Sequence, residues 1–228
     1  KANSLPKEHK EAANNNIRQC QFCLNRMRDG LSILCVNDNA KEAFTLANEA
    51  MLSQYLHYSV VSNECDTVRN PKIGLRNWRP FQIAFLLMNI RSMTDSSSEE
   101  HSLLDLIWFP TGGGKTEAYL GLTAFTLLLE RINKQPTKCT SVIMRYTLRL
   151  LSAQQFDRAA SLICALEMLR RRNPERLGEK TFSIGLWAGS AASPNTWEQA
   201  LHIKDDLRRG KQSAGAIPVT RCPWCGEE

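Results

Sequence analysis

The chain has 228 residues, enough for one domain with an appendage or two small domains, and enough to bury a core. Hydrophobic residues make up 43% and charged residues 23% of it, a balance typical of a soluble globular protein, and no apolar run reaches the ~18 residues that a membrane span needs. The net charge of +6 leans toward an anionic partner, and eight cysteines without regular spacing argue against a disulfide scaffold, so we expect a cytoplasmic protein in a reducing compartment.

The first hundred residues predict mostly helices. Lys1–Asn16 is polar, and we expect it to be frayed. In Asn39–Tyr58 apolar side chains recur at helical spacing, which predicts an amphipathic helix. The segment "RPFQIAFLLMNI" predicts a buried helix entered through Pro80, because proline suits the first turn of a helix. A polar surface loop, 92–102, follows.

The rest of the chain alternates short apolar runs with helical patterns. The first run is too short for a helix and is followed at once by a proline and glycines. The runs predict strands at Leu103–Phe109, Cys139–Tyr146 and Thr181–Trp187. Helices are predicted at Thr116–Ile132, Arg149–Arg172 and Thr196–Arg209. This alternation predicts an α/β fold with a parallel sheet flanked by helices, in which ligands gather at the carboxyl ends of the strands.

The segment "PTGGGKT" lies between the first predicted strand and its helix. Glycines leave backbone N–H groups uncovered and a helix N-terminus adds partial positive charge, so the pattern predicts a phosphate-binding loop rather than a mobile surface turn. Lys115 is expected to reach the β- and γ-phosphates and the Thr116 hydroxyl to hold Mg²⁺, which makes them the candidate catalytic residues. The strict pattern G-x-x-x-x-G-K-S/T has a glycine where this chain has Phe109. The residues expected to surround the phosphates are Thr111, Gly112, Gly113, Gly114, Lys115 and Thr116.

This loop resembles the phosphate loop of superfamily 2 helicases, in which Pro-Thr-Gly-x-Gly-Lys-Thr is common. Upstream, "RPFQ" resembles the R-P-x-Q segment of the same family. The resemblance implies a RecA-like nucleotide-binding domain with ATP and Mg²⁺ as cofactors. It also implies that Arg79 and Gln82 belong to the nucleotide site, with the Gln82 amide recognising adenine because it can both donate and accept. Taken alone, Gln82 is better explained as a surface residue at a helix start.

Two later segments resemble the DNA contacts of these helicases. The stretch "TLRLLSAQQ" resembles the segment P-T-R-x-L-x-x-Q, although the family's proline is absent, and "LWAGS" resembles a short glycine-containing segment that touches the tracking strand. The resemblance implies contacts with the phosphates of DNA and therefore low sequence specificity. The implied residues are Tyr146, Thr147, Arg149, Gln154, Gly189 and Ser190.

The sequence between these motifs, from about Cys20 to the end, is similar to the helicase subunit of the DISARM class of bacterial anti-phage systems. That resemblance implies an ATP-driven DNA translocase that works with a partner subunit. Superfamily 2 enzymes also need an acidic Asp-Glu pair after a later strand and a second RecA-like domain. Neither is found, since Asp205 and Asp206 lie in a polar helical pattern. We therefore expect a piece of a longer polypeptide that binds nucleotide without hydrolysing it alone.

The cysteines predict a structural zinc site. In "CPWCGEE", Cys222 and Cys225 can chelate one Zn²⁺, and the glycine that follows lets backbone amides turn toward the sulfurs. Zinc takes four ligands, so the other two come either from a second pair beyond Glu228 or from Cys20 and Cys23 in "CQFC".

These patterns divide the chain into three parts. They are a mostly helical N-terminal extension (1–75), an incomplete first RecA-like domain (76–212) and the start of an inserted zinc ribbon (213–228). Two alternatives to a helicase part remain. One is a P-loop NTPase switch, which has no need of "TLRLLSAQQ"; the other is a zinc-bearing interaction module with a degenerate glycine loop, which predicts no nucleotide binding.

Overall fold

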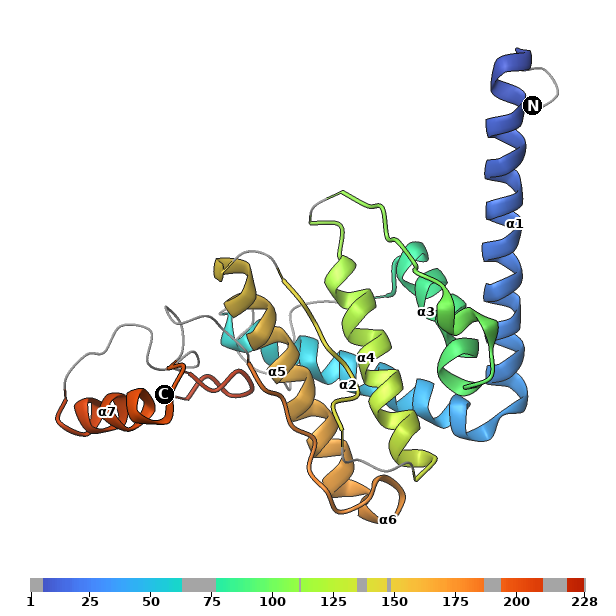
Figure 1. The fold of residues 1–228 in the computed structure, drawn as a ribbon. Coiled ribbons are helices and arrows are strands. Elements are labelled where there is room, and N and C mark those ends of the chain that lie inside the picture. The colour runs from blue at the N-terminus through green and yellow to red at the C-terminus, as the bar shows by residue number, and fades with distance from the viewer. Residues whose placement is uncertain are drawn as a thin grey trace. The chain divides into compact units, whose positions relative to one another are not determined.

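The computed structural model describes residues 6–62, 77–110, 112–134, 139–146, 149–186, 194–210 and 221–227. In that part of the chain the regular elements are all helices, and Figure 1 labels the longer ones. In chain order they are α1 (Lys7–Val36), α2 (Asp38–Val61), α3 (Pro80–Thr94), the short 3-10 helix η2 (Glu99–Ser102), α4 (Lys115–Ile132), α5 (Arg149–Arg172), α6 (Pro174–Leu177) and α7 (Trp197–Arg208). Among the described residues, no helix combines the length and the apolar character that crossing a membrane requires.

The helices predicted from apolar periodicity and end signals are confirmed as α2, α3, α4, α5 and α7. Helix α3 has Pro80 in its first turn, and α7 is capped by Thr196, whose hydroxyl accepts a hydrogen bond from the Gln199 N–H at 3.3 Å. The prediction that the N-terminus is frayed is wrong for Lys7–Asn16, which forms the first turns of α1. Pro6 precedes that helix, and Glu8 in its first turn complements the helix dipole.

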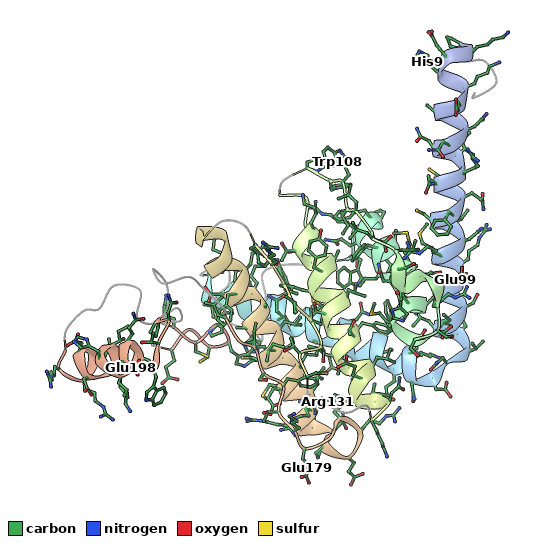
Figure 2. The ribbon with its side chains drawn as sticks, viewed as in Figure 1. His9, Glu99, Trp108, Arg131, Glu179 and Glu198 are labelled. Carbon is green, nitrogen blue, oxygen red and sulfur yellow. The ribbon has the colours of Figure 1, made fainter. Side chains whose placement is uncertain are left out.

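The predicted α/β fold, with its RecA-like parallel sheet, is wrong. No strand forms within the described residues, and 103–110, 141–146 and 181–186 run as extended chain instead. No backbone hydrogen bond joins 104–108 to another described segment, and the side chains of Leu104 and Trp108 are 96% and 89% exposed (Figure 2 labels Trp108). A sheet needs a neighbouring strand in register, and contacts distant in sequence decide that pairing. The strands predicted at these three apolar runs are therefore wrong, because no described segment pairs with them.

The described residues group into two compact units, and α2 contributes to both. The first unit comprises the described parts of Lys1–Glu49, Leu75–Val142 and Asn173–Gly178. Within it α3 packs against α1 and α4, and α4 packs against α6; α1 and α3 lie side by side in Figure 1. Its largest fully buried apolar side chains are those of Ile90, Leu120, Phe125, Leu128 and Leu177.

A buried cation ties the extended segment 103–110 to helix α1 in the first unit. Arg26 of α1 is only 3% exposed, and its guanidinium donates to both carboxylate oxygens of Asp105, at 2.6 and 2.8 Å. It also donates to Glu100 at 3.1 Å. A two-pronged guanidinium–carboxylate contact is both strong and directional, so it fixes the chain that leads into the glycine loop.

The second unit comprises the described parts of Ala50–Gly74, Ile143–Arg172 and Glu179–Glu228. Its core includes Leu162 and Leu166 of α5, both at most 1% exposed. Glu167 of the same helix accepts hydrogen bonds from Arg170 and from the backbone N–H of Phe182, the latter at 3.3 Å. A helix side chain thus holds an extended segment in this unit as well.

Candidate functional site

The glycine loop forms a tight turn that opens helix α4. Gly112 and Gly114 have φ angles of 75° and 87°, a region that glycine adopts without the strain a Cβ causes. The Gly113 N–H donates to the Pro110 carbonyl at 3.1 Å and closes the turn. Gly114 is the N-cap residue of α4, and as a glycine it has no side chain with which to cap the helix. The first N–H groups of an α-helix have no carbonyl partner within the helix, and they are the groups that bind anions at helix N-termini.

Two of the glycines are also required by close packing. A Cβ on Gly113 would lie 2.6 Å from Cδ1 of Phe109 and 2.9 Å from the Pro110 carbonyl oxygen. A Cβ on Gly114 would lie 2.7 Å from Nε2 of Gln82. The loop is therefore a packed element of the first unit.

The start of α3 holds the loop through its backbone. Nη1 of Arg79 donates to the Gly113 carbonyl, and Nε2 of Gln82 donates to the Gly114 carbonyl, both at 2.7 Å. Oε1 of Gln82 accepts from the Arg79 N–H at 2.8 Å. The structure thus brings Arg79 and Gln82, predicted for the nucleotide site, into direct contact with the predicted phosphate loop.

The predicted catalytic residues lie at the same turn. Nζ of Lys115 donates to the carbonyls of Phe109 and Pro110, at 2.6 and 3.0 Å, so its ammonium group lies across the loop. Thr116 is half-buried in the first turn of α4. The ring of Phe109 stacks on Phe81 of α3 with centroids 4.1 Å apart. A cation and the N–H groups of a helix start at one turn can bind an oxyanion, which fits a phosphate group.

The residues predicted to contact DNA belong to the second unit where the structure describes them. Tyr146 ends an extended segment and is 37% exposed, Gln154 is exposed on α5, and Arg149 begins that helix. Their contact with DNA stays a prediction. The predictions that fall outside the described residues concern Thr111, Thr147, Gly189 and Ser190.

The predicted zinc-binding cysteines form a compact turn, 222–227, here called the cysteine knuckle. The Cys222 N–H donates to the Glu227 carbonyl at 2.7 Å, and the Gly226 N–H donates to the Cys222 carbonyl at 2.8 Å. Backbone N–H groups of Cys225 and Trp224 donate to the Cys222 sulfur and lower the pKa of its thiol. The deprotonated thiolate is the form of cysteine that binds a metal ion. A lowered pKa of the Cys222 thiol favours that form, so the turn suits zinc.

Two helices of the second unit lie near the knuckle. The ring of Trp224 stacks on His57 of α2 with centroids 3.4 Å apart, and Nδ1 of His57 lies 2.8 Å from the Trp224 carbonyl oxygen. Burial raises the pKa of the Cys164 thiol on α5, and the nearby charges of Cys222 and Cys225 raise it further.

The other cysteine pair has a different setting. Cys20 and Cys23 lie within α1 of the first unit, so they sit on a continuous helix rather than on a knuckle. No group of three potential metal ligands converges among the residues that the structure describes. The ligands that complete the predicted zinc site therefore stay a prediction.

Sequence reasoning missed the residues that support these sites from a distance. Arg26 gave no signal, because its partner Asp105 is far away in the chain. Phe81 lies inside the "RPFQ" motif, and its position beside Gln82 was the one available clue. His57 gave no sign of its contact with Trp224.

The comparisons with known proteins support the predicted relationship to DISARM proteins. No protein-family model matches the chain. The chain is 36% identical to the DISARM protein DrmA of Bacillus paralicheniformis over an alignment of 241 residues, which covers 98% of this chain. It covers 21% of that protein, so the chain spans about a fifth of its relative's length. The similarity supports a relationship to DISARM proteins.

Proposed function

We propose that this chain is the nucleotide-binding part of an ATP-dependent DNA helicase or translocase in a bacterial anti-phage system of the DISARM class. The observation that carries the proposal is the glycine loop at the start of α4, with Lys115 and the hydrogen bonds from Arg79 and Gln82 of α3 to its carbonyls. The similarity to a DISARM protein and the helicase-like motifs support it. Because the relative is much longer, turnover and translocation are assigned to a longer polypeptide, and the partner subunit is part of the proposal.

The loop has the chemistry that a triphosphate requires. Its backbone N–H groups donate to phosphate oxygens, and the positive end of the α4 dipole favours their charge. The Lys115 ammonium would exchange its two carbonyl contacts for the β- and γ-phosphates, and the Thr116 hydroxyl would hold Mg²⁺. Mg²⁺ supplies charge neutralisation when it is bound.

Titration calorimetry with ATP and Mg²⁺ tests the proposal. We expect the wild-type protein to bind, and Lys115→Ala to bind about 30–100-fold more weakly because a charge-assisted hydrogen bond is lost. Lys41→Ala, which removes an exposed lysine from α2, is the matched control and keeps wild-type affinity. Absence of binding in both wild type and Lys115→Ala overturns the proposal and favours the zinc-bearing module.

DNA contact is proposed for the second unit through Tyr146, Arg149 and Gln154. Contacts of this kind reach phosphates rather than base edges, so affinity falls steeply with salt and depends little on sequence. A filter-binding series with single-stranded DNA of two unrelated sequences at increasing salt measures both properties. Strong preference for one sequence contradicts this part of the proposal.

A structural zinc ion is proposed at the cysteine knuckle, with Cys222 and Cys225 as two of its ligands. Metal analysis of the full-length protein is expected to find zinc in the wild type and less of it, by one ion per chain, in Cys222→Ser. Cys139→Ser, which replaces an exposed cysteine outside the knuckle, keeps the wild-type content. Equal zinc in all three proteins contradicts the assignment.

A further inference from the structure

The cysteine knuckle lies against one face of α2 within the second unit. The ring of His57 stacks on that of Trp224, with centroids 3.4 Å apart and an angle of 15° between the ring planes. Val61, four residues further along α2, lies beside Gly226, where an added Cβ would be 3.7 Å from its Cγ2. Residues four apart in a helix share a face, so the same face of α2 makes both contacts with the knuckle.

The Trp224 carbonyl is held by α2 and not by the bonds that close the knuckle. Those bonds join the Cys222 N–H to the Glu227 carbonyl and the Gly226 N–H to the Cys222 carbonyl. The Trp224 carbonyl oxygen lies instead 2.8 Å from Nδ1 of His57. Because a carbonyl oxygen only accepts hydrogen bonds, Nδ1 of His57 carries the hydrogen and donates it.

This hydrogen bond has a directional consequence for the next N–H group. In a trans peptide unit the C=O of one residue and the N–H of the next point in opposite directions. The Trp224 carbonyl points toward His57, so the N–H of Cys225 points away from it, and it donates to the Cys222 sulfur. Hydrogen bonds of this kind, made to a metal ligand from outside the ligand shell, orient the ligand and tune metal affinity.

We propose that His57 is a positioning residue of the zinc site, because it holds the Trp224 carbonyl and so keeps the Cys225 N–H aimed at the Cys222 sulfur. The inference rests on the zinc ion proposed above for the knuckle. It makes α2 part of the zinc site without adding a ligand, since His57 acts through the peptide unit between Trp224 and Cys225. Zinc affinity then depends on the donor at Nδ1 rather than on the aromatic ring.

Two substitutions separate the donor from the ring. His57→Phe keeps an aromatic ring to stack on Trp224 but has no N–H group to donate. His57→Asn has no ring, but its amide nitrogen lies one bond beyond Cγ, as Nδ1 does, and can donate. His202→Phe is the control, because His202 is an exposed histidine of the same unit and pairs with Asp206 of its own helix.

The zinc affinity of the full-length protein is measured by competition with a chromophoric chelator. We expect His57→Phe to bind zinc about tenfold more weakly than the wild type, the usual effect of losing a group that orients a metal ligand. His57→Asn recovers most of that loss, and His202→Phe keeps the wild-type affinity. Unchanged affinity in His57→Phe overturns the inference. An equal loss in His57→Phe and His57→Asn also overturns it, because the ring and not the donor would then be required.

Cobalt substitution adds a readout that a change in packing alone does not move. Absorption from thiolate to cobalt depends on the hydrogen bonds that the sulfur accepts, so we expect a shifted band in His57→Phe and the wild-type band in His57→Asn and His202→Phe. Identical spectra in the wild type and His57→Phe overturn the positioning role.

Hydrogen exchange in the zinc-free protein separates this inference from the proposed zinc site. We expect the Cys225 amide to exchange faster in His57→Phe than in the wild type, because its hydrogen bond to the Cys222 sulfur is loosened. Unchanged exchange overturns the role of His57. Faster exchange in His57→Phe, together with a wild type that binds no zinc, supports the hold of His57 on the knuckle and overturns the zinc site alone.

Discussion

The glycine loop and the cysteine knuckle are both short turns with a glycine at positive φ, yet they are held in different ways. The loop carbonyls bond to side chains 34 and 32 residues away in the sequence. The knuckle closes mainly through its own backbone, with hydrogen bonds across 222–227. Its described contacts to the rest of its unit include the stack of Trp224 on His57.

The difference shows how far a short sequence motif specifies the geometry of its own turn. In the knuckle, residue spacing and one glycine are enough to define the turn. In the loop, hydrogen bonds within the turn are joined by bonds from Arg79 and Gln82 of α3 to its carbonyls. We therefore expect the stability of the loop to respond to distant substitutions and the stability of the knuckle to respond mostly to substitutions within itself.

The largest effect is expected from the most distant support of the loop region. Arg26→Met removes a buried cation and leaves Asp105 and Glu100 without it, which we expect to lower the free energy of unfolding by about 3–5 kcal/mol. Urea unfolding at neutral pH measures the change.

The control for this substitution is an exposed ion pair between α3 and α1. Arg91 pairs with Asp29 at 3.0 Å, but both side chains are largely exposed, so Arg91→Met should cost less than about 1 kcal/mol. Similar small losses for Arg26→Met and Arg91→Met would show that long-range anchoring does not hold the loop region.

A matched pair of glycine substitutions compares the two turns directly. Gly114→Ala and Gly226→Ala both place a Cβ at positive φ, at 87° and 76°, and each should cost about 1–2 kcal/mol for that reason. The new Cβ at Gly114 also meets Nε2 of Gln82 at 2.7 Å, whereas the nearest atom at Gly226 is Cγ2 of Val61 at 3.7 Å.

Gly114→Ala should therefore be more destabilising than Gly226→Ala by about 1 kcal/mol, the value of a displaced hydrogen bond. Thermal unfolding of the two variants measures the difference, and ATP titration should show weaker binding in Gly114→Ala only. Equal destabilisation would mean that the hydrogen bonds from α3 add nothing to the turn.

The sequence predicted what depends on local pattern. Helix α5 was predicted with its observed ends, Arg149 and Arg172, because apolar periodicity and a following proline mark a helix within one window. The contact of "RPFQ" with the glycine loop was implied by resemblance, since two motifs of one family meet in space.

The sequence could not predict what depends on distant partners. The run Leu103–Phe109 has the composition of a strand, but Asp105 in its middle bonds to Arg26 on α1, 79 residues away. Nothing in the run indicates that pairing, so its composition predicts a sheet strand where the chain instead bonds to a helix. Phe109 was noted only as a departure from the glycine pattern, whereas its ring stacks on Phe81 and its carbonyl accepts from Lys115.

The smallest effect is expected from Glu167→Gln, because Glu167 of α5 bonds to a segment only 15 residues away in the chain. In the second unit Glu167 bonds to Arg170 and Arg171, three and four residues on, and to the Phe182 N–H. The hydrogen bonds from Arg170 first, then those from Arg171 and Phe182, lower the pKa of Glu167 from 4.5 to about 2.

The sign of the pH dependence follows from that lowered pKa. The folded protein binds the proton of Glu167 less tightly than the unfolded chain, so this carboxylate stabilises the fold fully above pH about 4.5. The contribution is lost as the pH falls from about 4.5 to about 2. Because Arg171 is mostly exposed, we expect Glu167→Gln to cost about 1–2 kcal/mol at pH 7, less than Arg26→Met.

Urea unfolding of wild type and Glu167→Gln between pH 7 and pH 2 measures this contribution. The two unfolding free energies should approach each other at the acid end, because the wild-type carboxylate becomes protonated as the pH nears its folded pKa of about 2 and then resembles the amide. A difference that persists unchanged at pH 2 would show that packing, not charge, fixes the segment. A loss at pH 7 as large as that of Arg26→Met would show that the contacts of Glu167 with nearby residues stabilise the fold as much as the long-range contacts of Arg26 do.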